Sequence, residues 1–547
     1  MIQGDKIKVT ISDLNNEGEG VVRAGDERFV VFVADALPGE EVEARLVTKK
    51  KNYGTAKVLR RLSESPERIT PACGIFGRCG GCQLQHISYG AQLRMKRKTV
   101  VDALERIGGI EAPNVHECVP SPELWGYRNK ASLPVQSLGG ESLRAGFYRP
   151  RSHDIIPYSD CPVLLPQINR NLNGLLAALR EEGFCGAREG RWSLPNELIR
   201  HIVVRQAQFG GDSLCAVIGR RPLSKKEEKS LRSAAQKMKG LSGMVYNIND
   251  SPGNFIWGGR TIPIYGAELM SERLGIYKFT FEASSFFQVN SAQALSLYEY
   301  AAGLALDGAP GKILELYSGV GSLTAFLAAG GAEVTAVESW LPAAKYIAGN
   351  AERNGIKKIV PHTAQAEDIA ESLSGSRCDV VVVDPPRSGC DEKVIAAMLK
   401  AVPERIVYVS CNPATLARDI KLLAEGGYTP LEARPFDMFP QTGHVETVVL
   451  LSKGEVDSKK IRVEFSLEDM DTSGFRQGAT YGQIKERVLE QTGLKVSSLY
   501  ISQVKRKCGL EVGQNYNLSK KENAKQPQCP PEKEAAIMEA LKYFGMI

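Results

Sequence analysis

The amino-acid sequence predicts an α/β protein: a Rossmann-like domain, a small β-barrel before it and a short appendage after it. Three observations lead to this prediction. Residues 1–62 contain short alternating strands separated by Gly, Asn and Asp turns. Residues 285–452 alternate between β-branched strand candidates and helices, which is typical of a buried parallel sheet covered on both faces. After Lys453 the sequence becomes polar, which indicates a separate unit.

The expected domain boundaries follow these changes of pattern. At 547 residues the chain is too long for one ordinary hydrophobic core. The predicted parts are a β-barrel at 1–62, a mixed α+β region at 63–280, the Rossmann-like domain at 281–453 and an appendage at 455–547. A helix near 89–109 belongs to the second part and could pack on the third. The topology of the second part is not predicted.

The composition excludes some classes of protein. No run approaches the roughly 18 apolar residues that a membrane helix needs, and the polar start lacks the apolar segment of a signal peptide. We therefore expect a cytoplasmic monomer with no membrane partner. In the cytoplasm the 12 cysteines should mostly stay reduced. The net charge of +6 is by itself weak evidence for a nucleic-acid partner.

The predicted barrel carries basic residues around an aromatic one, in TKKKNYGTAKVLRR at 48–61. Cationic side chains neutralise phosphates and aromatic rings stack on bases, so this stretch is consistent with a nucleic-acid-binding face. A solvated basic face is the alternative, and the sequence leaves both open. The same holds for VKRKCG at 504–509 and NLSKKENAKQ at 517–526 in the appendage.

A glycine turn between a strand and a helix predicts a nucleoside cofactor. In KILELYSGVGSLTAFLAAGG, Gly319 and Gly321 would let a ligand approach the backbone at the helix start. About twenty residues later a second strand ends in Glu338, where a carboxylate can accept hydrogen bonds from ribose hydroxyls. The third glycine of a dinucleotide fingerprint is replaced by Thr324, so S-adenosylmethionine fits better than a dinucleotide.

Three reactive side chains are predicted at strand ends. Asp384 ends the strand CDVVVVD, Cys411 follows RIVYVS, and Glu446 begins VETVVLL. Taken singly, each has an ordinary structural explanation: a turn residue, a buried thiol and a solvated strand end. Strand ends in a doubly wound sheet form the ligand crevice, so Asp384, Cys411 and the cofactor loop should meet there.

Methylation of a pyrimidine carbon needs these parts together. A thiolate that adds to C6 makes C5 nucleophilic enough to attack a methyl sulfonium. A carboxylate can then accept the C5 proton, after which the thiolate leaves. Transfer to nitrogen or oxygen would need no cysteine nucleophile. The residue types therefore favour Cys411 as nucleophile and Glu446 as base.

A cysteine cluster predicts a metal centre in the second part of the chain. Cys73, Cys79 and Cys82 have the spacing C-x5-C-x2-C, and Cys161 offers a fourth thiolate. Four sulfur ligands suit tetrahedral zinc or an iron–sulfur cluster, and the spacing alone does not separate the two.

The motifs FFQVN, ELYSGVGSLT, DPPRSG, SCNPATLARD and FPQTGHVE occur in this order. Over residues 1–452 the chain thereby resembles the RNA uridine-C5 methyltransferase family. The resemblance implies that Cys411 is the nucleophile and Glu446 the base. His444 could also serve as a base, and we interpret it as structural. It implies contacts with S-adenosylmethionine for Gln288, Tyr317, Ser322, Glu338 and Gln365, with Asp384 between cofactor and base. Ser322 departs from the asparagine of some members, and the alignment at Gln365 is loose.

The resemblance also bears on the metal and the substrate. The family branch with this cysteine pattern carries a [4Fe-4S] cluster and acts on ribosomal RNA, and its N-terminal barrel is an RNA-binding TRAM domain. We therefore expect methylation of a uridine in 23S rRNA. The same chemistry on transfer RNA is the nearest alternative, and a cytosine-C5 enzyme is a more distant one. A non-catalytic iron–sulfur RNA sensor would leave Asp384, Cys411 and Glu446 unexplained.

Overall fold

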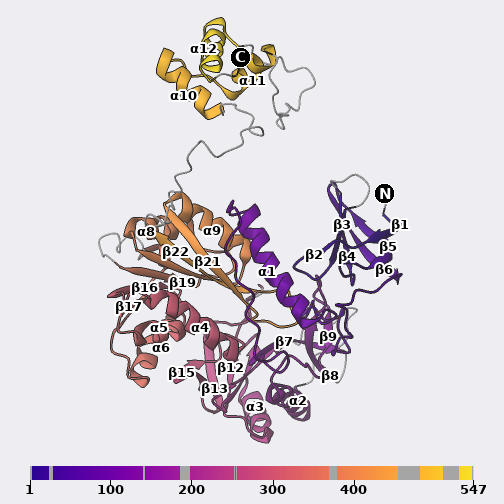
Figure 1. The fold of residues 1–547 in the computed structure, drawn as a ribbon. Coiled ribbons are helices and arrows are strands. Elements are labelled where there is room, and N and C mark those ends of the chain that lie inside the picture. Colours follow the sequence, from indigo (N-terminus) through magenta and orange to yellow (C-terminus); the bar gives the residue numbers. More distant parts are fainter. Residues whose placement is uncertain are drawn as a thin grey trace. The chain divides into compact units, whose positions relative to one another are not determined.

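The computed structural model describes residues 3–23, 29–138, 142–184, 198–251, 253, 255–368, 378–453, 481–508, 529–544 and 546. The chain forms two compact units, Met1–Val456 and Asp457–Ile547 (Figure 1). Within the described part of the chain, no helix is both long and apolar enough to cross a membrane.

The first unit begins with a curled six-stranded sheet in the order β1-β5-β6-β4-β3-β2. Its strands are β1 (Lys6–Thr10), β2 (Asp13–Leu14), β3 (Gly20–Arg23), β4 (Val30–Ala34), β5 (Glu41–Lys49) and β6 (Tyr53–Arg61). Alternate residues of β5, among them Val42, Ala44 and Leu46, are buried in its small core. The other face of β5 and β6 carries most of the exposed side chains, as the period-2 pattern requires.

Helix α1 (Tyr89–Arg106) follows the cysteine-rich segment and lies between the small sheet and the large C-terminal sheet of this unit (Figure 1). Ser88 caps its start by accepting a hydrogen bond from the Ala91 N–H. Met95 shares a small hydrophobic cluster with Leu37, from the loop between β4 and β5, whereas Val100 and Leu104 enter the core of the large sheet. The helix therefore joins the two parts through apolar packing.

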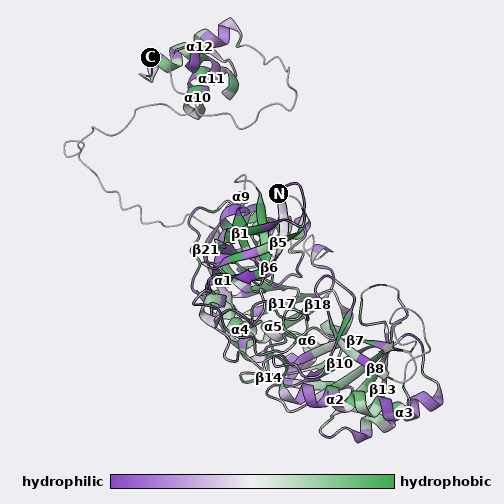
Figure 2. Ribbon diagram, turned by 90° about the vertical axis from the view of Figure 1, so that its right-hand side faces the viewer, coloured by the Kyte–Doolittle hydropathy of each residue, from purple (hydrophilic) through white to green (hydrophobic). Residues whose placement is uncertain are grey.

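The middle of the unit is a seven-stranded sheet in the order β13-β12-β11-β10-β7-β8-β9. Its elements are β7 (Lys130–Leu138), β8 (Ser142–Tyr148), β9 (Ile155–Pro157), α2 (Pro166–Glu181), β10 (Ile199–Gln206), β11 (Ser213–Gly219), α3 (Lys225–Lys237), β12 (Gly243–Ile248) and β13 (Arg260–Gly266). Strand β10 is almost entirely buried, whereas helix α3 is mostly hydrophilic (Figure 2). The hairpin β14 (Leu269–Leu274) and β15 (Tyr277–Glu282) leads into the last part.

The last part contains a Rossmann-like sheet in the order β18-β17-β16-β19-β20-β22-β21. The strands are β16 (Lys312–Leu316), β17 (Glu333–Glu338), β18 (Ile359–Thr363), β19 (Val380–Val383), β20 (Arg405–Ser410), β21 (Tyr428–Phe436) and β22 (Glu446–Lys453). The helices are α4 (Ser291–Leu306), α5 (Ser322–Ala329), α6 (Leu341–Arg353), α8 (Glu392–Ala401) and α9 (Pro413–Glu425). Strands β16 to β20 are parallel, whereas β22 is antiparallel to both of its neighbours.

The order of these strands reverses between β16 and β19, because the chain first builds outward from β16 to β18 and then resumes at β19. The carboxyl ends of strands at such a switch point flank the ligand crevice of an open α/β sheet. The loops after β16, β19 and β20 are therefore the ones to examine for a site.

The second unit has a hydrophobic core of its own. Helices α10 (Tyr481–Thr492), α11 (Ser498–Lys507) and α12 (Pro531–Tyr543) pack around Ile484, Val488, Ile501, Val504 and Ile537. Arg506 and Lys507 at the end of α11 are exposed. The basic stretch 517–526 lies outside the described residues.

Candidate active site

The register of the strands places the residues at the crevice end of β16, β19, β20 and β22 next to one another. Leu316 pairs with Val383, and Val383 pairs with Tyr408, so Tyr317 and Asp384 leave neighbouring strands side by side. In the antiparallel pair β20–β22, Ser410 lies opposite Thr447. Cys411 directly follows Ser410 and Glu446 directly precedes Thr447, so these two residues also adjoin across the strands.

The loop after β16 leaves space beside its backbone. Tyr317, Gly319 and Gly321 all have positive φ, at 64°, 59° and 83°, which turns the chain sharply into α5. A Cβ placed on Gly319 would meet no atom within 4 Å, so this side of the loop is open. Helix α5 begins without a side-chain cap, which leaves its first N–H groups available to a ligand.

Glu338 is held against this loop. Its carboxylate accepts a hydrogen bond from the Gly319 N–H at 2.9 Å and one from the Trp340 N–H at 2.7 Å. Each carboxylate oxygen can accept more than one hydrogen bond, so capacity remains for a ligand hydroxyl. Trp340, which the sequence analysis passed over, is 40% exposed next to this acid. An exposed aromatic directly after the acidic strand end is the signal that could have identified it.

A buried polar group lies behind the loop. Gln288 is buried, and the Ser322 hydroxyl lies 3.3 Å from that of Tyr298, on helix α4. The Thr324 hydroxyl donates to the carboxyl of Glu315 at 2.5 Å, so the residue that replaces the third fingerprint glycine has a hydrogen-bonding role. Burial raises the pKa of Glu315 to about 8. Neither Tyr298 nor Glu315 carried a signal in the sequence, because both lie within regular elements.

The three reactive residues influence one another's ionisation. Burial raises the pKa of Asp384 to about 7. Glu446 is buried, and burial together with the nearby Asp384 raises its pKa well above the usual range, whereas Arg387 opposes this shift. Burial, Glu446 and Asp384 raise the pKa of Cys411 to about 11, again opposed by Arg387. The predicted acid, thiol and base therefore converge, and Arg387 joins them.

Asn412 fixes the chain immediately after Cys411. Its side chain accepts from the Ala414 N–H at 3.1 Å, which caps α9, and donates to the Arg387 carbonyl at 3.0 Å. Pro413 occupies the first turn of α9, where no N–H is needed. The hydrogen bond from Asn412 to Arg387 thus joins the loops after β19 and β20, and Cys411 lies between β20 and α9.

The remaining predicted residues lie at the rim. Gln365 is exposed, and its neighbour Ala364 donates a backbone hydrogen bond to the Glu338 carbonyl at 3.2 Å. Gln365 is therefore close to the end of β17, which carries Glu338, and it does not contact Cys411. His444 lies with its Nε2 3.5 Å from the Arg387 guanidinium.

The four predicted metal ligands line one cavity of about 360 Å³. Cys73, Cys79, Cys82 and Cys161 share it with Arg128, Lys130 and Val289. The Gly81 N–H donates to the Cys79 sulfur at 3.3 Å. Over the described residues, no group of three or more His, Cys, Asp or Glu side chains is arranged to hold a metal ion. The thiols thus face a common space without converging on one point.

Comparison with known proteins identifies the family. The tRNA (Uracil-5-)-methyltransferase model matches residues 266–454, and the TRAM domain model matches residues 2–59. An uncharacterized RNA methyltransferase of Halalkalibacterium halodurans is 38% identical over 451 residues, which are 82% of this chain and 97% of that protein. The chain belongs to the RNA uracil-C5 methyltransferase family.

This methyltransferase also has structural relatives. The crystal structure of Pyrococcus abyssi tRNA (uracil-54, C5)-methyltransferase in complex with S-adenosyl-L-homocysteine is 28% identical, with a TM-score of 0.65. The match covers 81% of this chain and 99% of that one. An uncharacterized RNA methyltransferase of Clostridium acetobutylicum is 36% identical over 82% of this chain and 96% of its own length. The methyltransferase is thus an S-adenosylmethionine-dependent enzyme with an N-terminal TRAM domain, and it has sequence beyond the region shared with these relatives.

Proposed function

We propose that this methyltransferase transfers a methyl group to C5 of a uridine in 23S rRNA through a covalent enzyme–RNA adduct. The observation that carries the proposal is the adjacency of Cys411 and Glu446 at the ends of β20 and β22, beside the cofactor loop. A thiol and a carboxyl that adjoin at one end of the sheet supply the nucleophile and the base that C5 methylation requires.

In the first step Cys411 attacks C6 of the flipped uracil. Because its pKa is about 11, the thiol holds its proton at neutral pH in the free enzyme, and it releases that proton to solvent as the thiolate forms. The positive charge of the bound methyl sulfonium favours the thiolate, as does Arg387. The new sulfur–C6 bond moves the C5–C6 π electrons onto C5 and O4, which forms an enolate.

In the second step C5 attacks the methyl group of S-adenosylmethionine, so the C5–CH₃ bond forms as the sulfonium S–CH₃ bond breaks. Glu446 then accepts the C5 proton, the electrons of that C–H bond restore C5=C6, and the Cys411 thiolate leaves. The raised pKa of Glu446 makes its ionised form a stronger base than an exposed glutamate. Arg387 favours that ionised form.

The methyl donor is assigned to the loop after β16. Glu338 would accept hydrogen bonds from the ribose hydroxyls, and Trp340 offers a flat apolar surface for the adenine. Asp384 lies between donor and base. Gln288, Tyr317, Ser322 and Gln365 are proposed as further contacts with the donor, with Gln365 at the rim.

The four cysteines are proposed to hold a [4Fe-4S] cluster. A four-iron cluster keeps its thiolates farther apart than four ligands at about 2.3 Å from one zinc ion, which suits thiols that line a cavity without converging. Arg128 and Lys130 line the same cavity, and neither pairs with a carboxylate of the described residues, so both could balance the negative thiolates. The cluster would brace the surrounding loops.

Protein purified without oxygen is expected to contain about four irons per chain with matching acid-labile sulfide. Cys82→Ser should lose most of this iron, because one of four ligands is removed, whereas Cys215→Ser, at a buried cysteine of β11 that does not line the cavity, should keep it. Stoichiometric zinc in place of iron would contradict the assignment.

The TRAM sheet supplies a surface for RNA. Tyr53, Val47 and Leu59 are exposed on β5 and β6, and Arg45 lies opposite Lys57 in the register of these strands. Stacking surfaces beside cations suit a single-stranded RNA segment. This face would hold RNA while the target base is flipped into the crevice.

Transfer RNA is the second candidate substrate, because the structurally similar Pyrococcus abyssi enzyme acts on tRNA by its name. Purified 23S rRNA and tRNA, both lacking 5-methyluridine, separate the two. We expect about one methyl group per 23S rRNA at each target uridine, recovered as 5-methyluridine after digestion, and almost none in tRNA. The reverse preference would support the tRNA alternative.

A further inference from the structure

The loop that precedes Glu446 has an unusual amount of outside support. This 437–445 loop joins β21 to β22, and Glu446 is the first residue of β22. Gln441 has a φ of 71°, a left-handed conformation that costs free energy in a non-glycine residue. A Cβ on Gly443 would come within 1.7 Å of the Asn16 carbonyl of the TRAM sheet. Contacts from outside the loop must therefore hold its shape.

A buried ion pair provides one of these contacts. The Lys96 ammonium of α1 pairs with the carboxylate of Asp437, and both side chains are completely buried, at 0% exposure. The same ammonium donates to the Phe439 carbonyl at 3.1 Å. Two apolar residues of similar volume would often stabilise a protein as well as a buried pair, because burying charge is costly. Stability alone therefore does not account for this pair.

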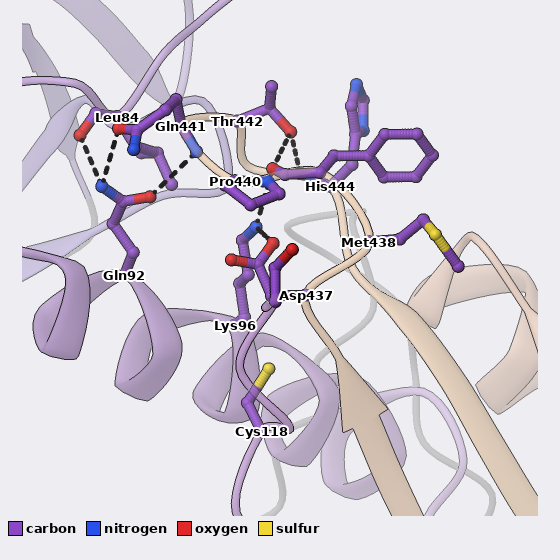
Figure 3. Close-up of polar contacts among 12 residues, drawn as sticks. Leu84, Gln92, Lys96, Cys118, Asp437, Met438, Pro440, Gln441, Thr442 and His444 are labelled. Atoms are coloured by element: carbon purple, nitrogen blue, oxygen red, sulfur yellow. Dashed lines mark hydrogen bonds and ion pairs between the residues drawn. The ribbon is translucent and has the colours of Figure 1, made fainter. Parts of the chain in front are cut away.

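A reciprocal amide pair provides the second contact, one turn earlier in α1. The Gln92 amide donates to the Gln441 side-chain oxygen at 3.1 Å and accepts from the Gln441 N–H at 3.1 Å. It also donates to the Leu84 and Ile87 carbonyls, next to the cysteine-rich segment. Figure 3 shows Gln92 facing Gln441 and Lys96 facing Asp437, both across the gap between α1 and the loop.

We infer that Gln92 and Lys96 are positioning residues that hold the 437–445 loop so that Glu446 meets the C5 proton. The inference rests on the proposed function, in which Glu446 is the base. Cys411 is fixed differently, through Asn412 and the Arg387 carbonyl. Loss of the α1 contacts should therefore displace the base while the nucleophile stays in place.

Gln92→Met and Lys96→Met test this directly, because methionine keeps the length of each side chain and removes its polar end. In single-turnover reactions with labelled RNA and methyl donor, both variants should form the methylated adduct at close to the wild-type rate. Its resolution should slow by on the order of 10- to 100-fold, since displacement of about 1 Å has that effect on a positioned group. The adduct should therefore accumulate on denaturing gels.

Lys98→Met is the matched control. Lys98 lies on the same helix, is 46% exposed and pairs with Asp13 and Asp102, away from the loop. Its adduct should resolve at the wild-type rate. Glu446→Gln is run in parallel: if it traps no adduct, the proposed function fails, rather than the positioning role alone.

Lys96→Met leaves Asp437 buried and unpaired, which could unfold the protein. The double variant Lys96→Met with Asp437→Leu removes both charges and should keep the fold. Slow adduct resolution in a folded double variant and in Gln92→Met supports the inference. Wild-type resolution in both, or an equal loss of adduct formation and resolution, overturns it.

Discussion

Cys411→Ala is expected to lower methyl transfer by on the order of 10⁴-fold or more, because C5 is then no longer activated by a covalent bond to C6. RNA binding should change less than about threefold, since contacts to phosphates usually dominate nucleic-acid affinity and an uncharged thiol supplies none. Measurement of methyl incorporation under single-turnover conditions, with RNA affinity at matched salt, checks both parts.

Cys378→Ala serves as the control for this variant. Cys378 lies just before β19, at the end of the strand opposite Asp384, so its loss should leave the crevice intact. It should methylate RNA at close to the wild-type rate. Full methylation by Cys411→Ala would show that the nucleophile has been wrongly assigned.

Glu446→Gln is expected to trap the methylated RNA on the enzyme. The amide keeps the shape of the side chain but cannot accept the C5 proton, so the thiolate cannot leave. Turnover should fall by about 10²- to 10⁴-fold, the usual contribution of a general base. An adduct that survives denaturation and carries label from both RNA and methyl donor is the measurement.

Glu432→Gln is the matched control for the base. Glu432 lies on β21 and pairs with His116 away from the crevice, so its variant should turn over without a trapped adduct. Adding Cys411→Ala to Glu446→Gln should abolish the adduct. Normal turnover by Glu446→Gln would exclude this residue as the base.

The sequence predicted the central strands better than the edges of the sheet. β19 and β20 consist almost entirely of apolar and β-branched residues because they are buried on both faces. The edge strands β18 and β21 contain proline and polar residues, so their sequences do not show the apolar pattern that predicts a buried strand. The antiparallel direction of β22 could not be predicted either, because strand direction depends on pairing and leaves no local sequence pattern.

The residues of the site also differ in how well the sequence predicts them. Asp384, Cys411 and Glu446 could be predicted because each stands at the end of a recognisable strand. Arg387 could also have been predicted, because it is a cation close after the end of a strand. The contact between Lys96 and Asp437 joins residues 341 positions apart, and no local pattern reports such a pair. Long-range polar contacts of this kind become visible only in the folded chain.

The most direct test of the central claim follows the hydrogen at C5. The 23S rRNA substrate is prepared with tritium at C5 of its uridines and incubated with the enzyme and S-adenosylmethionine. The proposed chemistry predicts one tritium released to water for each methyl group incorporated, and none with Cys411→Ala. Methyl incorporation without tritium release would place the new methyl on nitrogen or oxygen, and would contradict the account.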